Sequence, residues 1–293
     1  MIQGNRTKDT ASTQATRNRD YAASLARAFG GALIFSLPLL MTMEMWSLGF
    51  TIDRIRLALF FLLGVVLIVG LSRFGGFERT ASMFEDVLDA FAAIAVAALA
   101  SALILAIFGV IDSGMGLGEI AGKIALQTVP AGFGAMIARK QLSSGGGDDE
   151  QEDAEDDGAD LRRSGYGAEL FLMLCGALFL ALNIAPTEEM IVIGYKMSPT
   201  QGLTLVLLSI VLLHVFVYAL GFSGQKQRAE GHGFWSTFFG YSVPGYAIAV
   251  LVALYALWTF GRTNDIGPGE VALATAVLAF PAAIGAAIAR LVV

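Results

Sequence analysis

Residues 116–139 read GLGEIAGKIALQTVPAGFGAMIAR, and residues 267–290 read GPGEVALATAVLAFPAAIGAAIAR. The two stretches are identical at twelve of 24 positions without a gap. A helix needs about 20 mostly apolar residues to cross the hydrocarbon core of a bilayer, and both stretches meet that requirement. The pair therefore predicts two related transmembrane helices, one in each half of the chain.

A second pair of stretches extends the likeness. Residues 31–50 (GALIFSLPLLMTMEMWSLGF) match residues 176–195 (GALFLALNIAPTEEMIVIGY) at eight of 20 positions. Chance similarity between apolar helices would match mainly Leu, Ala and Val, but polar residues match here: Thr42 with Thr187, Glu44 with Glu189, and Glu119 with Glu270. This pattern indicates duplication of a four-helix unit. An even number of helices gives two parallel repeats related by an axis along the membrane normal.

The composition of the whole chain agrees with a membrane protein. Of 293 residues, 56% are hydrophobic and 15% are charged, whereas about 25% are charged in soluble domains. Eight runs are long and apolar enough to span, and they are residues 27–49, 55–73, 86–111, 118–138, 167–194, 201–222, 235–261 and 269–290. The predicted fold is all-α, a polytopic bundle of transmembrane helices arranged as two parallel four-helix repeats.

The spans divide the chain into four parts. They are a disordered cytoplasmic N-terminus (1–26), a first repeat (27–140), an acidic cytoplasmic linker (141–165) and a second repeat (166–293). The linker holds nine carboxylates between Asp148 and Asp160 and has almost no apolar residue to bury. Such a segment is expected to be disordered, and it is most often a solvated tether.

Lysine and arginine predict the orientation, because short cytoplasmic loops carry an excess of them. On an alternating eight-helix path, fourteen of these residues fall on the side of the termini and the linker, and five fall on the other side. Both termini are therefore expected in the cytoplasm.

Several functional classes lack support in the sequence. The basic residues are scattered and form no nucleic-acid-binding patch. A single cysteine and two histidines make a zinc site improbable. No nucleophile–base pair and no phosphate-binding glycine loop is evident, so we expect no metal, no cofactor and no enzymatic activity.

Glu44 and Glu189 are the leading candidates for a functional site, because ionisable residues inside a membrane segment are costly. Each follows a threonine, Thr42 or Thr187, and Glu188 precedes the second acid. Two carboxylates near the repeat axis would suit a proton or a small cation. The alternative is that both lie solvated at the outer interface, about 25 Å along helices that rise about 1.5 Å per residue.

Secondary candidates occur on other helices. Glu119 and Glu270 begin the fourth helix of each unit, where a carboxylate also serves simply to cap the helix. Lys123 lies one turn after Glu119 and can neutralise it. His214 is expected in the middle of the sixth span, where it is either hydrogen-bonded to another helix or part of a proton relay.

The double unit, the Gly-Ala-Leu opening of the first helix, and the PTEEM (186–190) and GPGE (267–270) segments resemble a bacterial family of integral membrane proteins, domain-of-unknown-function family 2391. The resemblance covers nearly the whole chain outside residues 1–20 and the linker. It implies a multi-pass protein of the bacterial inner (plasma) membrane, and it implies no particular activity.

The preferred hypothesis is a transporter or channel-like protein for a proton or small ion, with a site between the repeats. The alternative is a non-transporting sensor, scaffold or assembly factor. A wide, polar-lined crevice between the halves would favour transport, and a dry, packed interface would favour the alternative. Apart from a proton or small ion, the lipid bilayer is the only partner that the sequence indicates. The sequence does not predict the oligomeric state.

Overall fold

The computed structural model describes residues 3–75, 83–143, 166–219 and 234–292. They are helical almost throughout and contain no strand. The elements are α1 (Gln3–Leu40), α2 (Met43–Thr51), α3 (Arg54–Gly75), α4 (Met83–Ile107), α5 (Leu117–Ser143), α7 (Tyr166–Ile184), α8 (Glu188–Lys196), α9 (Pro199–Ala219), α10 (Phe234–Thr237), the π-helix η1 (Phe238–Ser242), α11 (Val243–Thr259) and α12 (Pro268–Val292).

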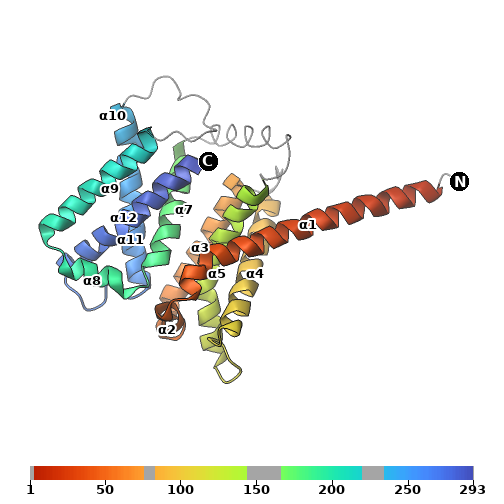
Figure 1. The fold of residues 1–293 in the computed structure, drawn as a ribbon, viewed down its shortest axis with the longest axis horizontal. Coiled ribbons are helices and arrows are strands. Elements are labelled where there is room, and N and C mark those ends of the chain that lie inside the picture. The colour runs from red at the N-terminus through yellow and green to blue at the C-terminus, as the bar shows by residue number, and fades with distance from the viewer. Residues whose placement is uncertain (1–2, 76–82, 144–165, 220–233, 293) are drawn as a thin grey trace.

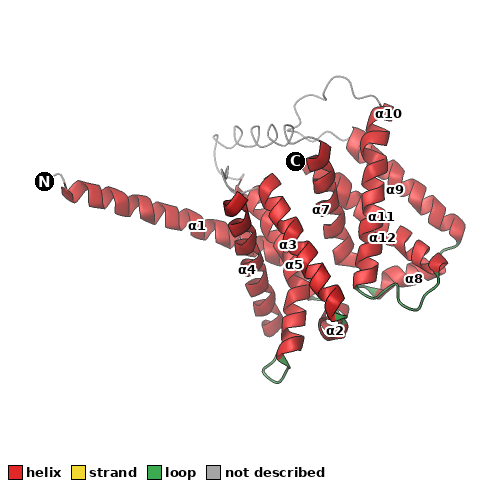
Figure 2. Cartoon of the chain, turned by 180° about the vertical axis from the view of Figure 1, so that it is seen from behind, coloured by secondary structure: helices red, strands yellow, loops and turns green. Residues whose placement is uncertain are grey.

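The eight predicted spans are confirmed as helices long and apolar enough to cross a bilayer. The second predicted run is provided by α3, with a span from Arg54 to Arg73. The helices α1–α5 and α7–α12 form two groups that stand side by side (Figures 1 and 2). The short helices α2 and α8 lie at one end of the bundle, called the α8 end below, and α10 and the C-terminus lie at the opposite end (Figure 1).

Two of the expected runs, 27–49 and 167–194, do not form one continuous helix each. Their spanning helices end earlier than predicted, at Leu40 and Ile184. The chain breaks after Leu40 and again after Ile184, and a helix of nine residues follows each break. Thr42 and Thr187 take extended backbone conformations at these breaks. Their hydroxyls donate to the carbonyl oxygens of Leu39 (2.9 Å) and Ile184 (2.8 Å), so each threonine offers the backbone an alternative to a helical bond.

The breaks are called the first elbow (residues 41–42) and the second elbow (residues 185–187). Pro186 reinforces the second, since proline has no N–H to donate.

The N-terminus differs from its prediction as well. Helix α1 begins at Gln3, so residues 3–26, expected to be disordered, are helical and continuous with the first span. Helix propagation from an already formed span fixes one residue for each bond gained, which is easier than starting a new helix. The predicted disorder of the linker lies outside the described residues, apart from 141–143, which end α5.

Each half contains one close helix crossing between paired glycines. A Cβ added to Gly31 of α1 would meet Ala138 and lie 2.6 Å from the carbonyl oxygen of Gly134 on α5. A Cβ added to Gly176 of α7 would meet the carbonyl oxygen of Gly285 on α12. Small residues let helices approach closely in membranes, where apolar side chains gain little by leaving lipid.

The seventh span contains a π-turn that the sequence did not predict. Pro244 cannot donate to Gly240, the residue four positions earlier. The carbonyl oxygen of Gly240 instead accepts a bond from the Tyr166 hydroxyl at 2.6 Å. The proline therefore frees a carbonyl within η1, and a neighbouring helix satisfies it.

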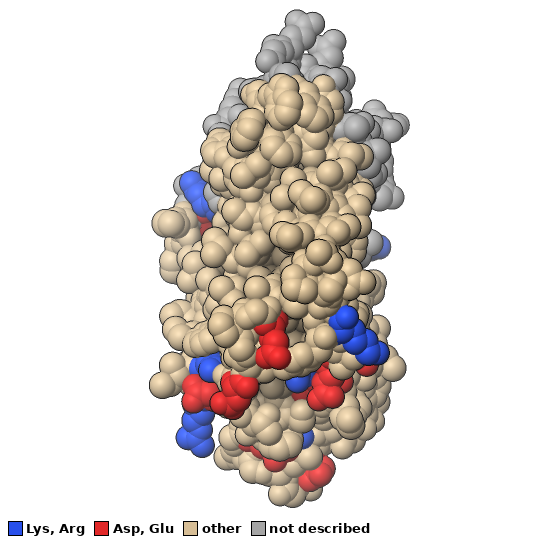
Figure 3. Space-filling view, turned by 90° about the vertical axis from the view of Figure 1, so that its left-hand side faces the viewer, with Lys and Arg blue, Asp and Glu red and all other residues tan. Residues whose placement is uncertain are grey.

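Charged side chains are unevenly distributed over the second half. Seen from the side of α8 and α9, they gather toward the α8 end, and a broad uncharged surface extends beyond them (Figure 3). Leu203, Leu207 and Val211 on α9 are exposed apolar residues. A surface of this composition suits contact with lipid.

Candidate functional site

The paired glutamates lie in the first turns of the short helices α2 and α8, at the same end of the bundle (Figure 1). Glu44 is half-buried, and Glu189 and its neighbour Glu188 are exposed. Neither Glu44 nor Glu189 forms a side-chain ion pair or hydrogen bond with any described residue. Because each acid follows the end of a complete span, this placement favours the interfacial alternative over a shared site within the bundle.

The interface between the two halves is apolar and aromatic. The ring of Phe35 on α1 meets Phe179 on α7 edge-on, with centroids 5.1 Å apart. Phe60 on α3 lies 5.8 Å from Phe260, which follows α11. One cluster of buried hydrophobic residues runs through both halves without interruption. The halves thus share a single core in the described part of the chain.

Arg56 adds a polar link between the halves at the α8 end. Its guanidinium donates to the carbonyl oxygen of Trp258 at 2.8 Å and to Asn264 Oδ1 at 3.0 Å. It also lies 5.0 Å from the centroid of the Trp258 ring. Cation–π contact and two hydrogen bonds together fasten α3 to the end of α11.

The first elbow is anchored from inside the bundle. Gln127 on α5 is 1% exposed, and its Nε2 donates to the carbonyl oxygen of Leu39 at 3.2 Å. The indole N–H of Trp46 donates to the carbonyl oxygen of Leu40 at 2.7 Å. The carbonyls freed by the break are therefore satisfied by side chains, as burial requires. The Oε1 atom of Gln127 is buried without a partner among the described residues.

The second elbow is anchored from a loop. Arg262, between α11 and α12, donates to the carbonyl oxygen of Pro186, and its Nη1 lies 3.9 Å from Glu188 Oε1. This arginine was not singled out by the sequence, because it lies in a loop and has no matching basic residue in the first half. Arg262 and Pro186 are 76 positions apart in the sequence, so no local pattern links them.

Lys123 and Glu119 form an ion pair between a buried ammonium and a partly exposed carboxylate at the α8 end of the first half. The Lys123 side chain is 6% exposed, and its Nζ lies 2.7 Å from Glu119 Oε1. The ammonium also donates to the carbonyl oxygen of Val110 at 3.0 Å and lies 5.8 Å from the centroid of the Phe50 ring. This confirms the expected neutralisation of Glu119, and the pair also ties α5 to α2 and to the loop before α5.

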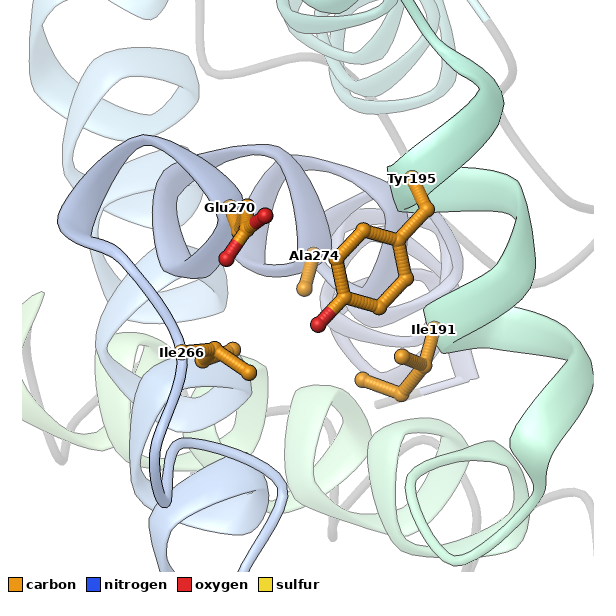
Figure 4. A pocket seen from close by; sticks show the side chains of 5 residues that line it. All are labelled: Ile191, Tyr195, Ile266, Glu270 and Ala274. Carbon is orange, nitrogen blue, oxygen red and sulfur yellow. The ribbon is translucent and has the colours of Figure 1, made fainter.

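Glu270 has no such basic neighbour in the part of the chain that the structure describes. One of its carboxylate oxygens accepts the backbone N–H of Gly267 at 2.8 Å, which is a capping contact. The acid faces a narrow hollow between α8 and α12 that is lined by Ile191, Tyr195, Ile266 and Ala274 (Figure 4). The residue one turn further on is Ala274, where the first half has Lys123.

His214 lies five residues before the end of α9, away from the elbows, and not at the middle of its helix. Its Nδ1 is 2.8 Å from the Ser242 hydroxyl of η1. The rings of Tyr218, Phe234 and Phe238 surround the imidazole, and Nε2 is buried without a partner in the described part of the chain. The hydrogen bond to another helix agrees with a packing role.

Among the described residues the candidates do not form one site: Glu44 and the Glu119–Lys123 pair lie in the first half, and Glu189, Glu270 and His214 lie on three different helices of the second half. Within the described residues, no three His, Cys, Asp or Glu side chains lie close enough together to hold a metal ion.

Eight spanning helices around a continuous apolar core define a polytopic α-helical integral membrane protein. The chain belongs to the family described as "Putative integral membrane protein (DUF2391)", whose model matches residues 24–293. No curated protein and no solved structure matches the chain.

Proposed function

We propose that the protein is a non-transporting membrane protein, a sensor or scaffold, whose two halves are held against each other as one body. The observation that carries this proposal is the shared apolar core, with Phe35 packed on Phe179 and Phe60 packed on Phe260. Moving one half against the other would separate these aromatic pairs. A route between the halves would also need polar lining, which these contacts do not provide.

The orientation belongs to the same proposal. In a bacterial inner membrane, both termini would be cytoplasmic and the α8 end would face outward. Single cysteines introduced at Ser144 and Asn264 can be treated with a membrane-impermeant maleimide in intact cells, since the native Cys175 is buried. Labelling at Asn264 and protection at Ser144 is expected. The reverse pattern would invert the orientation.

Ion flux into proteoliposomes tests the function itself. With proton, sodium or potassium gradients, we expect rates equal to those of protein-free vesicles. Wild-type flux that disappears when Glu44→Gln and Glu189→Gln are combined would overturn the proposal and establish a transport site at the paired acids. The amide keeps the shape of each side chain and removes its charge.

Proton or ion transport within the first half is a second candidate. It is favoured by the buried Oε1 of Gln127, which has no partner among the described residues and lies one turn from Lys123. Orphaned polar atoms are rare in membrane interiors and are often functional. Flux that survives the double glutamate substitution but is lost in Gln127→Leu would select this candidate.

A further inference from the structure

The second half contains a hollow at the position where the first half holds a lysine side chain. The paired stretches set Lys123 opposite Ala274 and Glu119 opposite Glu270. The other pair extends the correspondence, because Phe50 falls opposite Tyr195. In the first half, Glu119 and Phe50 contact the Lys123 ammonium.

The backbone supports the same correspondence. Gly49 on α2 packs against Lys123, so closely that an added Cβ would meet the lysine side chain. Gly194 on α8 packs against Ala274, whose Cβ would lie 3.6 Å from an added Cβ. Helix α2 therefore crosses α5 where α8 crosses α12, at matching residues of the two halves. The hollow thus corresponds to the space that the lysine side chain fills.

The walls of the hollow suit an ammonium ion with a short alkyl chain. Figure 4 shows the Glu270 carboxylate and the Tyr195 ring on either side of Ala274. A carboxylate and an aromatic face both attract an ammonium group, and Ile191 and Ile266 offer apolar contact to methylenes. A bare metal ion would find too few oxygen ligands here, since Ca²⁺ takes about six to eight.

We propose that this hollow binds a small primary alkylammonium ion, with the ammonium at Glu270 and the alkyl chain against Tyr195, Ile191 and Ile266. Both Glu270 and Tyr195 are exposed and can be reached from water. No water-sized sphere fits in the hollow as it stands, so the ligand enters as the Tyr195 ring turns aside. The inference goes beyond the proposed function and holds whether or not the protein transports anything.

The probe for this site is n-butylammonium, which reproduces the side chain of lysine. Binding to the purified, detergent-solubilised full chain can be followed by ligand-observed NMR, with n-butanol and sodium as controls. Saturable binding near 1 mM or weaker is expected for so small a ligand. Glu270→Gln should weaken it at least tenfold, and Glu189→Gln, which removes the same charge nearby on α8, should leave it unchanged.

Two further variants keep the test decisive. Ala274→Lys places a tethered ammonium in the hollow and should abolish butylammonium binding while the protein remains folded. Lys123→Ala opens the matching space in the first half and should create a second site for the probe.

Three outcomes would overturn the proposal. They are the absence of saturable binding in the wild type, binding that persists in Glu270→Gln, and equal competition by sodium. Binding to Lys123→Ala alone would show that the probe is competent and that the second half lacks the site.

Discussion

The first and second elbows break the chain at matching threonines, yet different kinds of side chain anchor them. At the first elbow, the buried amide of Gln127 reaches Leu39 from the last helix of the unit. At the second elbow, the corresponding helix carries Leu278, and Arg262 reaches Pro186 from a loop. The freed carbonyls at both elbows thus require a donor, whereas the identity and origin of the donor differ between the halves.

The same contrast extends to charge. The first half buries the Lys123 ammonium against the partly exposed Glu119, and the second half leaves Glu270 facing a hollow. The first half therefore carries a neutralised acid at the α8 end, whereas Glu270 in the second half has no cation beside it among the described residues.

The largest expected loss of stability is at the close glycine crossings, which both halves contain. Gly31→Ala and Gly176→Ala would each drive a methyl group into the backbone of a facing helix, so each should destabilise the protein by about 3 kcal/mol or more. Denaturant unfolding in detergent measures this. Gly30→Ala and Gly167→Ala, where an added Cβ meets nothing within 4 Å, are the matched controls, and equal losses in all four variants would refute the close crossings.

Removing the side chain that anchors each elbow should cost less stability, and the cost should differ between the two elbows. Gln127→Ala leaves the buried carbonyl of Leu39 without its amide donor and should cost about 2 to 3 kcal/mol. Arg262→Ala should cost about 1 kcal/mol, because the arginine is 21% exposed and water can replace it. If Arg262→Ala proved the more damaging in the same unfolding measurement, the ranking of the two anchors would be wrong.

Glu119 and Glu270 begin matching helices, but neutralising the acid should lower the unfolding free energy only at Glu119. Glu119→Gln leaves the Lys123 ammonium without its carboxylate, and we expect a loss of about 1 to 2 kcal/mol, since Glu119 is 31% exposed and partly screened by water. Glu270→Gln has no ion pair to break with the described residues and should change the unfolding free energy by less than about 0.5 kcal/mol. Similar losses in the two variants would show that helix capping dominates both.

The smallest effect concerns the paired glutamates. At an interfacial position, Glu44→Gln and Glu189→Gln should each change the unfolding free energy by less than about 0.5 kcal/mol. A loss above about 2 kcal/mol in either variant would reveal a buried partner that the interfacial placement does not include.

The sequence predicted the features that depend on apolar length. Hydropathy located the eight spans, and the aligned stretches brought Thr42 and Thr187 to matching elbows. Apolar length could not reveal the elbows themselves, because the short helices α2 and α8 continue the hydrophobic run. Their position depends on hydroxyl and proline effects that act within three or four residues.

The candidate sites were predicted less well, because they depend on contacts between distant segments. Arg262 and Pro186 are 76 positions apart, and Gln127 and Leu39 are 88 apart. Pairing Lys123 with Glu119 succeeded because they lie four residues apart on one helix. Local spacing thus identified the ion pair, whereas the anchors of the elbows required the folded chain.

The distance between the two halves tests most directly whether they are held together as one body. Spin labels at Leu62 on α3 and Leu207 on α9, which are 60% and 64% exposed, report that distance by pulsed electron paramagnetic resonance in lipid. The shared apolar core predicts one narrow distance distribution that is unchanged by pH, sodium or potassium. Two populations whose proportions shift with any of these ions would contradict it, because the halves would then move against each other as a transporter requires.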